Sequence, residues 1–310
     1  MLDALPVIFR VLGAGAGGGL PQWNCGCPNC TAVRAGDPRV RPRTQDSLAF
    51  SSHGDRWHLI NASPDILRQI EANPPLWPRH ARHSPIASIV LSNGDLDHVL
   101  GLFSLRESWP LVVYATGAVR RGLHDRNAMV RTLERFEGQV TFRELELDRD
   151  VEIEPGLTIT ARAARGKLPV HLEKLCSPSP EDNVSIWVRQ EGMGASAATK
   201  TAVYFGATSS ADGLREALGG VGCLFFDGTF WSSDELVALG LSRARAEDMA
   251  HLPIGGATGS LAALDGMSLG RKIYTHINNS NPIVVEGSAE EQAVRASGWE
   301  IAYDGMEVEL

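Results

Sequence analysis

Two acidic residues and a histidine stand close together in the segment SNGDLDH, residues 92–98, directly after the apolar run IASIVL. The run has the length and composition of a buried strand, so Asp95, Asp97 and His98 follow its carboxyl end. Carboxylate and imidazole groups in a short loop at the end of a strand can bind a divalent metal ion. The spacing alone leaves alternatives open. Asp97 could cap a following helix, and His98 could be a buried histidine of the core.

Three cysteines form a second candidate metal site, a structural Zn(II) site. Cys25, Cys27 and Cys30 have C-x-C-x2-C spacing within WNCGCPNC. Thiolates at this spacing can converge on one tetrahedral zinc ion, and the fourth ligand must come from elsewhere in the chain. Five cysteines is an odd number, and their clustering fits a metal site in a reducing compartment better than a disulfide framework. The other two, Cys176 and Cys223, are expected to take no part.

The composition of the whole chain describes a soluble globular protein. It has 310 residues, 43% hydrophobic and 21% charged, with a formal net charge of -8. The charge argues against a general nucleic-acid or membrane-surface binder. No apolar stretch of about 20 residues occurs and no secretory signal is recognisable, so we expect a cytoplasmic protein without membrane insertion. We expect a single domain over residues 1–310, with a cysteine-rich zinc loop at residues 13–45.

Apolar patterns along the chain predict two sheets with helices between many of the strands. SLAFSS and WHLINAS alternate as a strand pair around an HGD turn, and WEIAYDGMEVEL is expected to form a closing strand pair. The segment AVRRGLHDRNAMVRTLERF has the spacing of one amphipathic helix. The order of the elements favours an α/β (α+β) fold, an αββα sandwich of two sheets packed face to face with helices outside.

Several segments, in this order, resemble the PqqB family of pyrroloquinoline quinone (PQQ) biosynthesis proteins. They are GAGAGGGLPQWNCGCPNC, INASPDI, DLDHVLGL, DGTFW, HINNSNP and AYDGMEVEL, and together they extend over essentially the whole chain. The resemblance implies a metallo-β-lactamase fold. It also implies a part in PQQ biosynthesis, because the family is associated with iron-dependent hydroxylation of a peptidyl tyrosine. The family has also been regarded as involved in transport.

The wider superfamily binds two metal ions through an H-x-H-x-D-H loop, two further histidines and a bridging aspartate. On that frame, this chain has Asn93 and Asp95 in place of the first two histidines. Arg165 and Gly166 stand where the third is expected, and Ala207 stands at the bridging position. The resemblance therefore implies that one of the two metal positions has lost its ligands, and a metal-dependent hydrolase becomes the least favoured function.

The second metal position keeps Asp97, His98 and His276 on the same frame. Two imidazoles and one carboxylate with open coordination positions are the ligand set of non-haem Fe(II) oxygenases. We therefore expect Fe(II) at this position, with O2 as co-substrate. Asp95 could supply a further ligand or a hydrogen bond to one.

Other positions acquire roles from the resemblance. His251 falls where some superfamily hydrolases have a catalytic histidine, so it is expected to move protons, with a structural loop histidine as the alternative. Asp227, at the end of a buried strand, could orient His251 or a metal-bound histidine, or simply form a turn. Three residues past His276, a relative with this cysteine cluster has a histidine, whereas this chain has Asn279. The fourth zinc ligand could be Asn279, His276 or water.

The remaining histidines are expected to lie at the surface, His58 among them. His171 belongs to a long loop rich in proline and serine, residues 167–182, which could cover a substrate. The favoured function is an Fe(II)/O2-dependent hydroxylase acting on a tyrosine-containing peptide, or its cross-linked derivative, from the PQQ pathway. The alternative is a carrier of PQQ or its precursor without turnover. A homo-oligomer is possible, and no nucleic-acid partner is expected.

Overall fold

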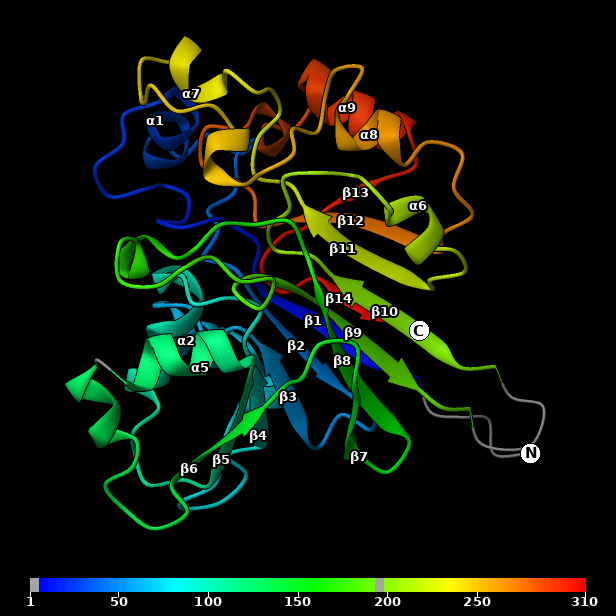
Figure 1. Ribbon diagram of the computed structural model, residues 1–310. Helices are drawn as coiled ribbons and strands as arrows, with labels where there is room; N and C mark the ends of the chain where they lie inside the picture. The colour runs from blue at the N-terminus through cyan, green and yellow to red at the C-terminus, as the bar shows by residue number, and fades with distance from the viewer. Residues whose placement is uncertain (1–5, 126, 193–197) are drawn as a thin grey trace.

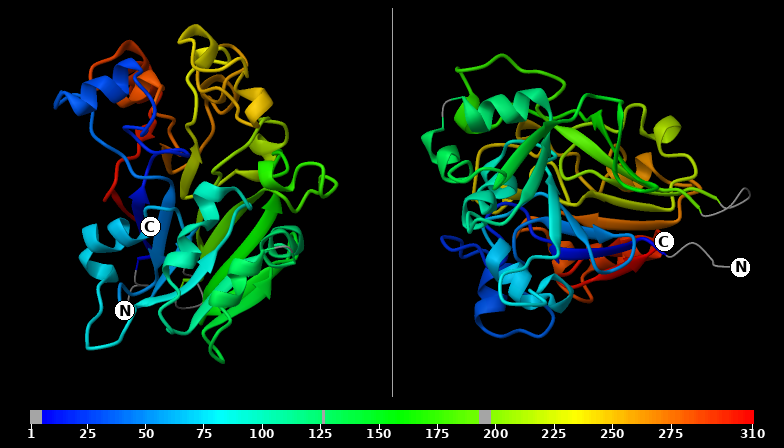
Figure 2. Two further views of the ribbon diagram at one scale, coloured as in Figure 1. Left: turned by 90° about the vertical axis from the view of Figure 1, so that its left-hand side faces the viewer. Right: turned by 90° about the horizontal axis from the view of Figure 1, so that it is seen from below.

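The computed structural model describes residues 6–125, 127–192 and 198–310. Within them, two seven-stranded sheets pack face to face (Figures 1 and 2). Helices α2 (Ile66–Ala72) and α5 (Gly117–His124) cover the outer face of one sheet, and α9 (Ala289–Ala296) lies outside the other (Figure 1). The expected αββα sandwich is confirmed.

The first sheet has the strand order β14-β1-β2-β3-β4-β5-β6. Strands β3 to β6 run parallel, and β2 and β3 form the predicted antiparallel pair, joined by a turn in which Gly54 has a φ of 75°. The bounds are β1 Ile8–Gly13, β2 Ser47–Ser51, β3 Trp57–Ile60, β4 Ile86–Val90, β5 Leu111–Ala115, β6 Val140–Glu144 and β14 Glu307–Glu309.

The second sheet has the strand order β13-β12-β11-β10-β9-β8-β7, and β10 to β13 run parallel. Because parallel strands end at the same edge of a sheet, the loops after β11 and β12 are neighbours. The bounds are β7 Asp150–Glu154, β8 Leu157–Ala163, β9 Val184–Gln190, β10 Lys200–Tyr204, β11 Cys223–Asp227, β12 Arg271–Thr275 and β13 Glu300–Ile301.

The predicted closing strand pair is wrong. Strand β13 lies beside β12 in the second sheet, whereas β14 pairs with β1 in the first. Between them, the carboxylate of Asp304 accepts hydrogen bonds from the backbone N–H groups of Ala14 and Thr44, at 3.0 and 2.7 Å. These bonds hold the segment where the chain passes from one sheet to the other. A pattern of two short apolar runs cannot reveal such a crossing.

The helices are short, and the long helix predicted over residues 118–136 is wrong. Helix α5 ends at His124, and Asn127 begins a separate 3-10 helix by accepting a hydrogen bond from the N–H of Met129 at 3.0 Å. The further helices are α1 Pro28–Arg34, α3 Leu96–Val99, α4 Gly101–Ser104, α6 Leu214–Ala217, α7 Glu235–Ala238 and α8 Ser260–Ala263. The 3-10 turns are η1 Pro74–Leu76, η2 Ala128–Thr132, η3 Val170–Leu172, η4 Glu247–Met249 and η5 Pro282–Val284.

Apolar side chains from both sheets fill the space between them. Phe9 packs against Phe50 of its own sheet and Phe225 of the other, with ring centroids 5.8 and 5.7 Å apart. His58 is also buried here, 2.7 Å from the hydroxyl of Ser88, so the expectation that it is solvated is wrong. All four residues of β3 are buried, because this strand is central and covered on both faces.

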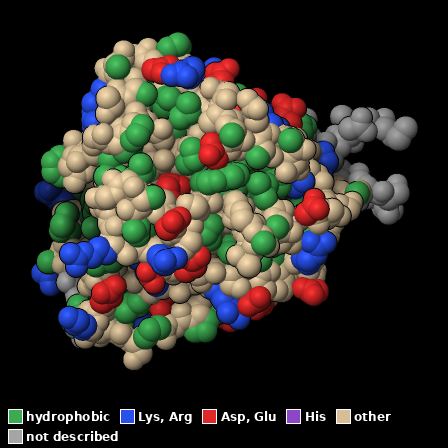
Figure 3. All heavy atoms as spheres, turned by 90° about the horizontal axis from the view of Figure 1, so that it is seen from above, with side chains coloured by type: hydrophobic (Ala, Val, Ile, Leu, Met, Phe, Trp, Pro, Cys, Tyr) green, Lys and Arg blue, Asp and Glu red, His purple; other side chains and the backbone are tan. Residues whose placement is uncertain are grey.

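The outer surface carries mixed charges. Basic and acidic side chains are interspersed among apolar ones on the face that Figure 3 shows. Among the helices of the described residues, none combines the length and the apolar composition needed to cross a bilayer.

Candidate metal centres

Loops that follow strands of both sheets bring Asp97, His98 and His276 together at one edge of the sandwich. His98 and Asp97 lie in α3, just after β4, and His276 follows β12 directly. The Nε2 atoms of His276 and His98 lie 3.4 and 3.7 Å from Oδ2 of Asp97. One ligand atom from each residue lies within 4.8 Å of the others. His276 has a φ of 53°, a left-handed conformation that a residue other than glycine adopts at some cost in free energy.

The donor atoms of this group fit a bound metal ion. The Nδ1 atoms of His98 and His276 lie 3.2 and 2.9 Å from the hydroxyls of Ser92 and Thr229, so each ring directs Nε2 at Asp97. Nε2 of His98 is buried and makes no hydrogen bond in the structure. A buried ring nitrogen without a partner is costly, and a metal ion at this point would remove that cost. The histidine–carboxylate set therefore fits a single metal ion.

The backbone of Gly17 lies close to this group. A Cβ atom at Gly17 would lie 3.2 Å from Oδ2 of Asp97, closer than most real contacts of that kind. The glycine-rich loop after β1 thus passes directly beside the carboxylate that faces both imidazoles.

Charge interactions favour the ionised form of both partners. Burial alone would raise the pKa of Asp97, but His98 and the hydrogen bond from His276 hold it below its ordinary range. Burial alone would lower the pKa of His276, yet the hydrogen bond to Asp97 and the charge of Asp46 raise it to about 9. Strong negative potential at His276 is the environment that a cation needs.

The helix-capping alternative for Asp97 is wrong, because Asp95 is the residue at the N-cap of α3 and Asp97 lies within the first turn. The side chain of Asp95 makes no capping hydrogen bond, and it lines the same pocket as the three converging residues. Burial raises the pKa of Asp95.

A pocket of about 240 Å³ opens onto the three ligand atoms. Of the positions at which the superfamily frame loses its metal ligands, Asn93, Asp95, Gly166 and Ala207 line this pocket, whereas Arg165 is exposed and does not line it. Nδ2 of Asn93 lies 3.3 Å from Oδ1 of Asn183, whose own Nδ2 donates to the carbonyl of Ala207 at 3.0 Å. The neutral amide of Asn93 is a poor replacement for imidazole, and Gly166 and Ala207 have no ligating side chain.

His251 also lines the pocket and is held by Asp227. Its Nδ1 lies 2.8 Å from Oδ2 of Asp227. The same carboxylate accepts hydrogen bonds from the N–H groups of Thr208 and Thr229, at 3.0 Å each, and from the Thr229 hydroxyl at 2.7 Å. Burial opposes ionisation of Asp227, but His251 lowers its pKa. The carboxylate is thus used as an acceptor for its neighbours, although Asp227, His251 and His276 also lie within 4.8 Å of one another.

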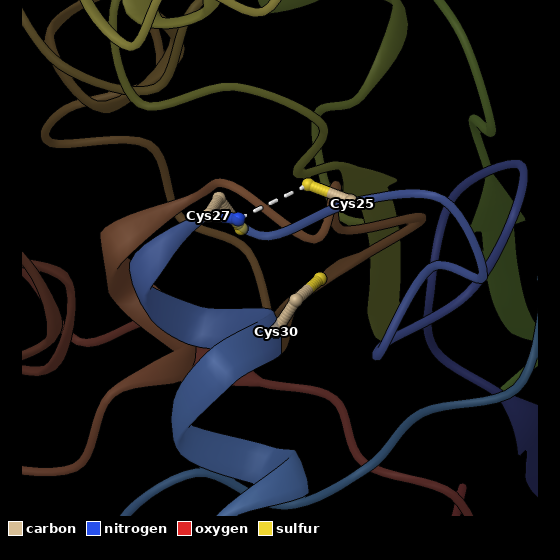
Figure 4. Close-up of side chains that lie close together, drawn as sticks. All are labelled: Cys25, Cys27 and Cys30. Carbon is tan, nitrogen blue, oxygen red and sulfur yellow. Dashed lines mark hydrogen bonds between the residues drawn. The ribbon is translucent and has the colours of Figure 1, made fainter.

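The three cysteines converge at the start of α1 (Figure 4). Nδ2 of Asn279 lies 3.2, 3.4 and 3.4 Å from the sulfur atoms of Cys25, Cys27 and Cys30. In a tetrahedral zinc site with three sulfur ligands and one oxygen ligand, a sulfur–oxygen edge is about 3.5 Å. The Asn279 amide nitrogen thus lies at about the distance from the three sulfur atoms that a fourth ligand atom would have, and a rotation of the amide group would bring its oxygen there instead. His276, the other side chain considered as a fourth ligand, faces Asp97 and not the cysteines.

Comparisons with known proteins agree with the observed fold and with the resemblance to the PqqB family. Residues 56–277 match the family model of the beta-lactamase superfamily domain. The chain is 42% identical to coenzyme PQQ synthesis protein B of Methylobacterium radiotolerans, over 97% of this chain and 99% of that protein. It is 45% identical to the protein of the same name from Rhizobium meliloti, over 97% of each. The chain belongs to the PqqB family.

Solved structures agree with this membership. The crystal structure of Zn²⁺-bound PqqB from Methylobacterium extorquens matches with a TM-score of 0.90 and 38% identity, over 98% of this chain and all of that one. A diphosphatase of the PhnP family matches with a TM-score of 0.66 at 19% identity, which shows a common fold only.

The structure adds residues to the PqqB site that the sequence did not single out. Lys167 lines the pocket beside Gly166, and Thr229 links Asp227 to Nδ1 of His276. Thr229 lies within DGTFW, one of the segments that resemble the PqqB family, so its place in that segment was an available signal. Lys167 follows the lost ligand position by one residue, but a lysine there has no distinctive spacing. His171 is exposed.

Proposed function

We propose that this member of the PqqB family is a non-haem Fe(II)/O2-dependent hydroxylase of a tyrosine-bearing precursor of PQQ. The observation that carries the proposal is the convergence of Asp97, His98 and His276 beside a pocket. Asn93, Gly166 and Ala207, at positions of the lost ligands, offer no imidazole or carboxylate to a second metal ion. The names of the relatives support a part in PQQ biosynthesis. Two imidazoles and one carboxylate with open positions suit iron chemistry with O2.

When bound, Fe(II) would supply the activation of O2, which protein side chains cannot perform. Asp97, His98 and His276 would hold it and leave further positions open to the pocket. In the hydroxylation, one oxygen atom replaces a ring hydrogen as a hydroxyl group and the other leaves as water. Two electrons and two protons come from an added reductant such as ascorbate.

The remaining residues bind and orient the substrate in this proposal. Phe230 and Met249 give the pocket an apolar wall for an aromatic ring. His251 uses Nδ1 on Asp227, so its Nε2 is free to exchange a proton with the phenol oxygen. Lys167 supplies a positive charge at the rim for a carboxylate of the substrate.

We further propose a structural zinc ion at Cys25, Cys27 and Cys30, with Asn279 at the fourth position. The convergence of three thiols around one amide supports it, as does the crystal structure of PqqB from Methylobacterium extorquens, which is Zn²⁺-bound. A hydrolase that uses two metal ions is disfavoured, because such enzymes hold the ions about 3.5–4 Å apart and need ligands for both.

The test is anaerobic reconstitution with Fe(II), followed by O2, ascorbate and a short tyrosine-containing peptide. Mass spectrometry should find a gain of one oxygen atom, and an oxygen electrode should record matching consumption of O2. His98→Ala is the matched variant and should give neither. A protein that binds PQQ tightly and never modifies the peptide would contradict the hydroxylase and favour a carrier.

A further inference from the structure

A buried row of hydrogen bonds runs from Asp46 to the metal-facing histidine His98. The hydroxyl of Tyr204 donates to Oδ2 of Asp46, and Nδ2 of Asn61 lies 2.9 Å from the Tyr204 oxygen. The hydroxyl of Ser92 lies 3.0 Å from Oδ1 of Asn61 and 3.2 Å from Nδ1 of His98. Each of the five side chains is at most 1% exposed, so water does not compete for these bonds.

The direction of every bond in this row follows from the carboxylate at its end. A carboxylate of Asp46 only accepts, so Tyr204 must donate to it and can accept from Asn61. This fixes the amide of Asn61 with its oxygen toward Ser92, where it accepts from both the N–H and the hydroxyl at 3.0 Å. The oxygen of Ser92 is then left to accept from Nδ1–H of His98.

Tyr204 is held as a permanent donor. Burial, together with the charge of Asp46, raises the pKa of Tyr204 well above its ordinary value. The hydroxyl therefore keeps its proton near neutral pH, where it donates to Asp46.

The same carboxylate also reaches the other histidine. Oδ1 of Asp46 accepts a hydrogen bond from the hydroxyl of Thr275 at 2.9 Å, and Thr275 precedes His276 directly. Asn61 and Ser92 follow strands of the first sheet, whereas Tyr204 and Thr275 end strands of the second. Asp46 is thus linked to His98 through hydrogen bonds and to the residue that directly precedes His276.

We propose that Asp46 and Tyr204 are positioning residues for the metal centre. Through Asn61 and Ser92, they fix His98 as the Nδ1–H tautomer, with the lone pair of Nε2 directed at the metal position. The inference rests on the metal centre of the proposed function, but not on the hydroxylation. A ligand histidine whose second nitrogen loses its partner typically binds metal 10–100-fold less tightly.

The chain offers a matched pair of variants for the test. Tyr204→Phe removes one hydroxyl from the row. Tyr274→Phe removes a hydroxyl that is equally buried in the same sheet but bonds to Ser260 at 2.8 Å, outside the row. Ser92→Ala removes the acceptor of Nδ1–H directly and tests the same row if Tyr204→Phe does not fold. The readouts are ¹⁵N NMR of the His98 ring in metal-free protein, and the dissociation constant for Fe(II) alone under anaerobic dialysis.

We expect a single Nδ1–H tautomer of His98 in the unaltered protein and in Tyr274→Phe. Tyr204→Phe and Ser92→Ala should give a mixture of tautomers and bind Fe(II) about 10–100-fold more weakly. An Nε2–H tautomer in the unaltered protein would overturn the inference, as would a folded Tyr204→Phe protein with the tautomer and affinity of Tyr274→Phe. A protein that binds Fe(II) tightly but never hydroxylates would instead contradict the proposed function alone.

Discussion

The contact between His251 and Asp227 leaves one ring nitrogen of His251 without this partner, and a substitution can test its proposed part in proton transfer. Nδ1 of His251 is bound to Asp227, so Nε2 is the ring nitrogen left for a substrate in the pocket that His251 lines. His251→Ala should keep its Fe(II) and lose roughly 10²–10⁴-fold in the rate of product formation. His171→Ala, at an exposed loop position outside the pocket, is the control. Unchanged turnover would make His251 a structural loop residue, and loss of iron would make it a metal ligand.

Lys167 tests whether the pocket selects a carboxylate-bearing substrate. A charge-assisted hydrogen bond contributes about 1.5–3 kcal/mol. If Lys167 makes this bond equally in the bound substrate and in the transition state, its loss raises KM and leaves kcat little changed. Lys167→Met should therefore raise KM about 10–100-fold, as steady-state kinetics would measure. Lys174→Met, exposed in the same loop, is the control. If kcat falls and KM does not change, Lys167 acts on the reaction and not on binding.

At the residue scale, the sequence was informative where a position matched a known frame. Asp97, His98 and His276 were identified in this way, and the structure brings their ligand atoms within 4.8 Å of one another. Tyr204 and Asp46 could not be found, because 158 positions separate them and neither type signals a metal site. Contacts of that kind depend on how the two sheets pack.

The three cysteines connect two segments of the chain, and a substitution can test the zinc ion proposed between them. The thiols hold the segment before α1 against the loop that carries Asn279. Cys27→Ser should lose the zinc and loosen both segments, because a structural zinc site contributes directly to folding. Elemental analysis and limited proteolysis would measure this, with the exposed Cys176→Ser as control. A Cys27→Ser protein with its full zinc content would contradict the assignment.

Helix α7 carries a pH-sensitive contact. Burial raises the pKa of Glu235 from 4.5 to about 7, although hydrogen bonds from Ser280 and Trp231 oppose the shift. The folded state therefore favours the protonated carboxyl, and the resulting stability is complete below pH 4.5 and is lost as the pH rises through 7. Glutamine does not titrate, so Glu235→Gln should remove this loss. The unfolding free energy of Glu235→Gln minus that of the unaltered protein should be on the order of 3 kcal/mol larger at pH 8 than at pH 4.5.

Urea unfolding of the variant and the unaltered protein at both pH values would measure that difference. Glu216→Gln, exposed on α6, is the control for a change of charge. If the two proteins differ in unfolding free energy by the same amount at pH 4.5 and at pH 8, Glu235 does not titrate in the way proposed.

Local sequence patterns predicted well which segments form strands. They predicted less well where helices end and which strands pair. The β2–β3 pair follows from alternation and a turn, which are local features. The break after α5 and the separation of β13 from β14 depend on a side-chain cap and on Asp304, which belong to tertiary structure. Short apolar runs contain no information about which sheet receives them.

At the scale of the whole molecule, the αββα sandwich and the PqqB family followed from the order of the motifs, and both are confirmed. The site lies where the two sheets end at one edge, so each sheet supplies part of it. His98 comes with the first sheet and His276 with the second. The pocket forms only when the two sheets pack together, so the sequence pointed to the three candidate ligands but not to Phe230 and Met249, which also line the pocket.

In the proposed function, this edge of the sandwich holds a metal ion that uses O2, and not one that activates water. The most direct test is the source of the oxygen atom. Iron-reconstituted protein, ascorbate and the tyrosine-containing peptide are exposed to ¹⁸O2 in ordinary water, and the product mass is measured beside that of His98→Ala. We expect one ¹⁸O atom in the product of the unaltered protein and no product from His98→Ala. Oxygen derived from water, or equal product from both proteins, would contradict it.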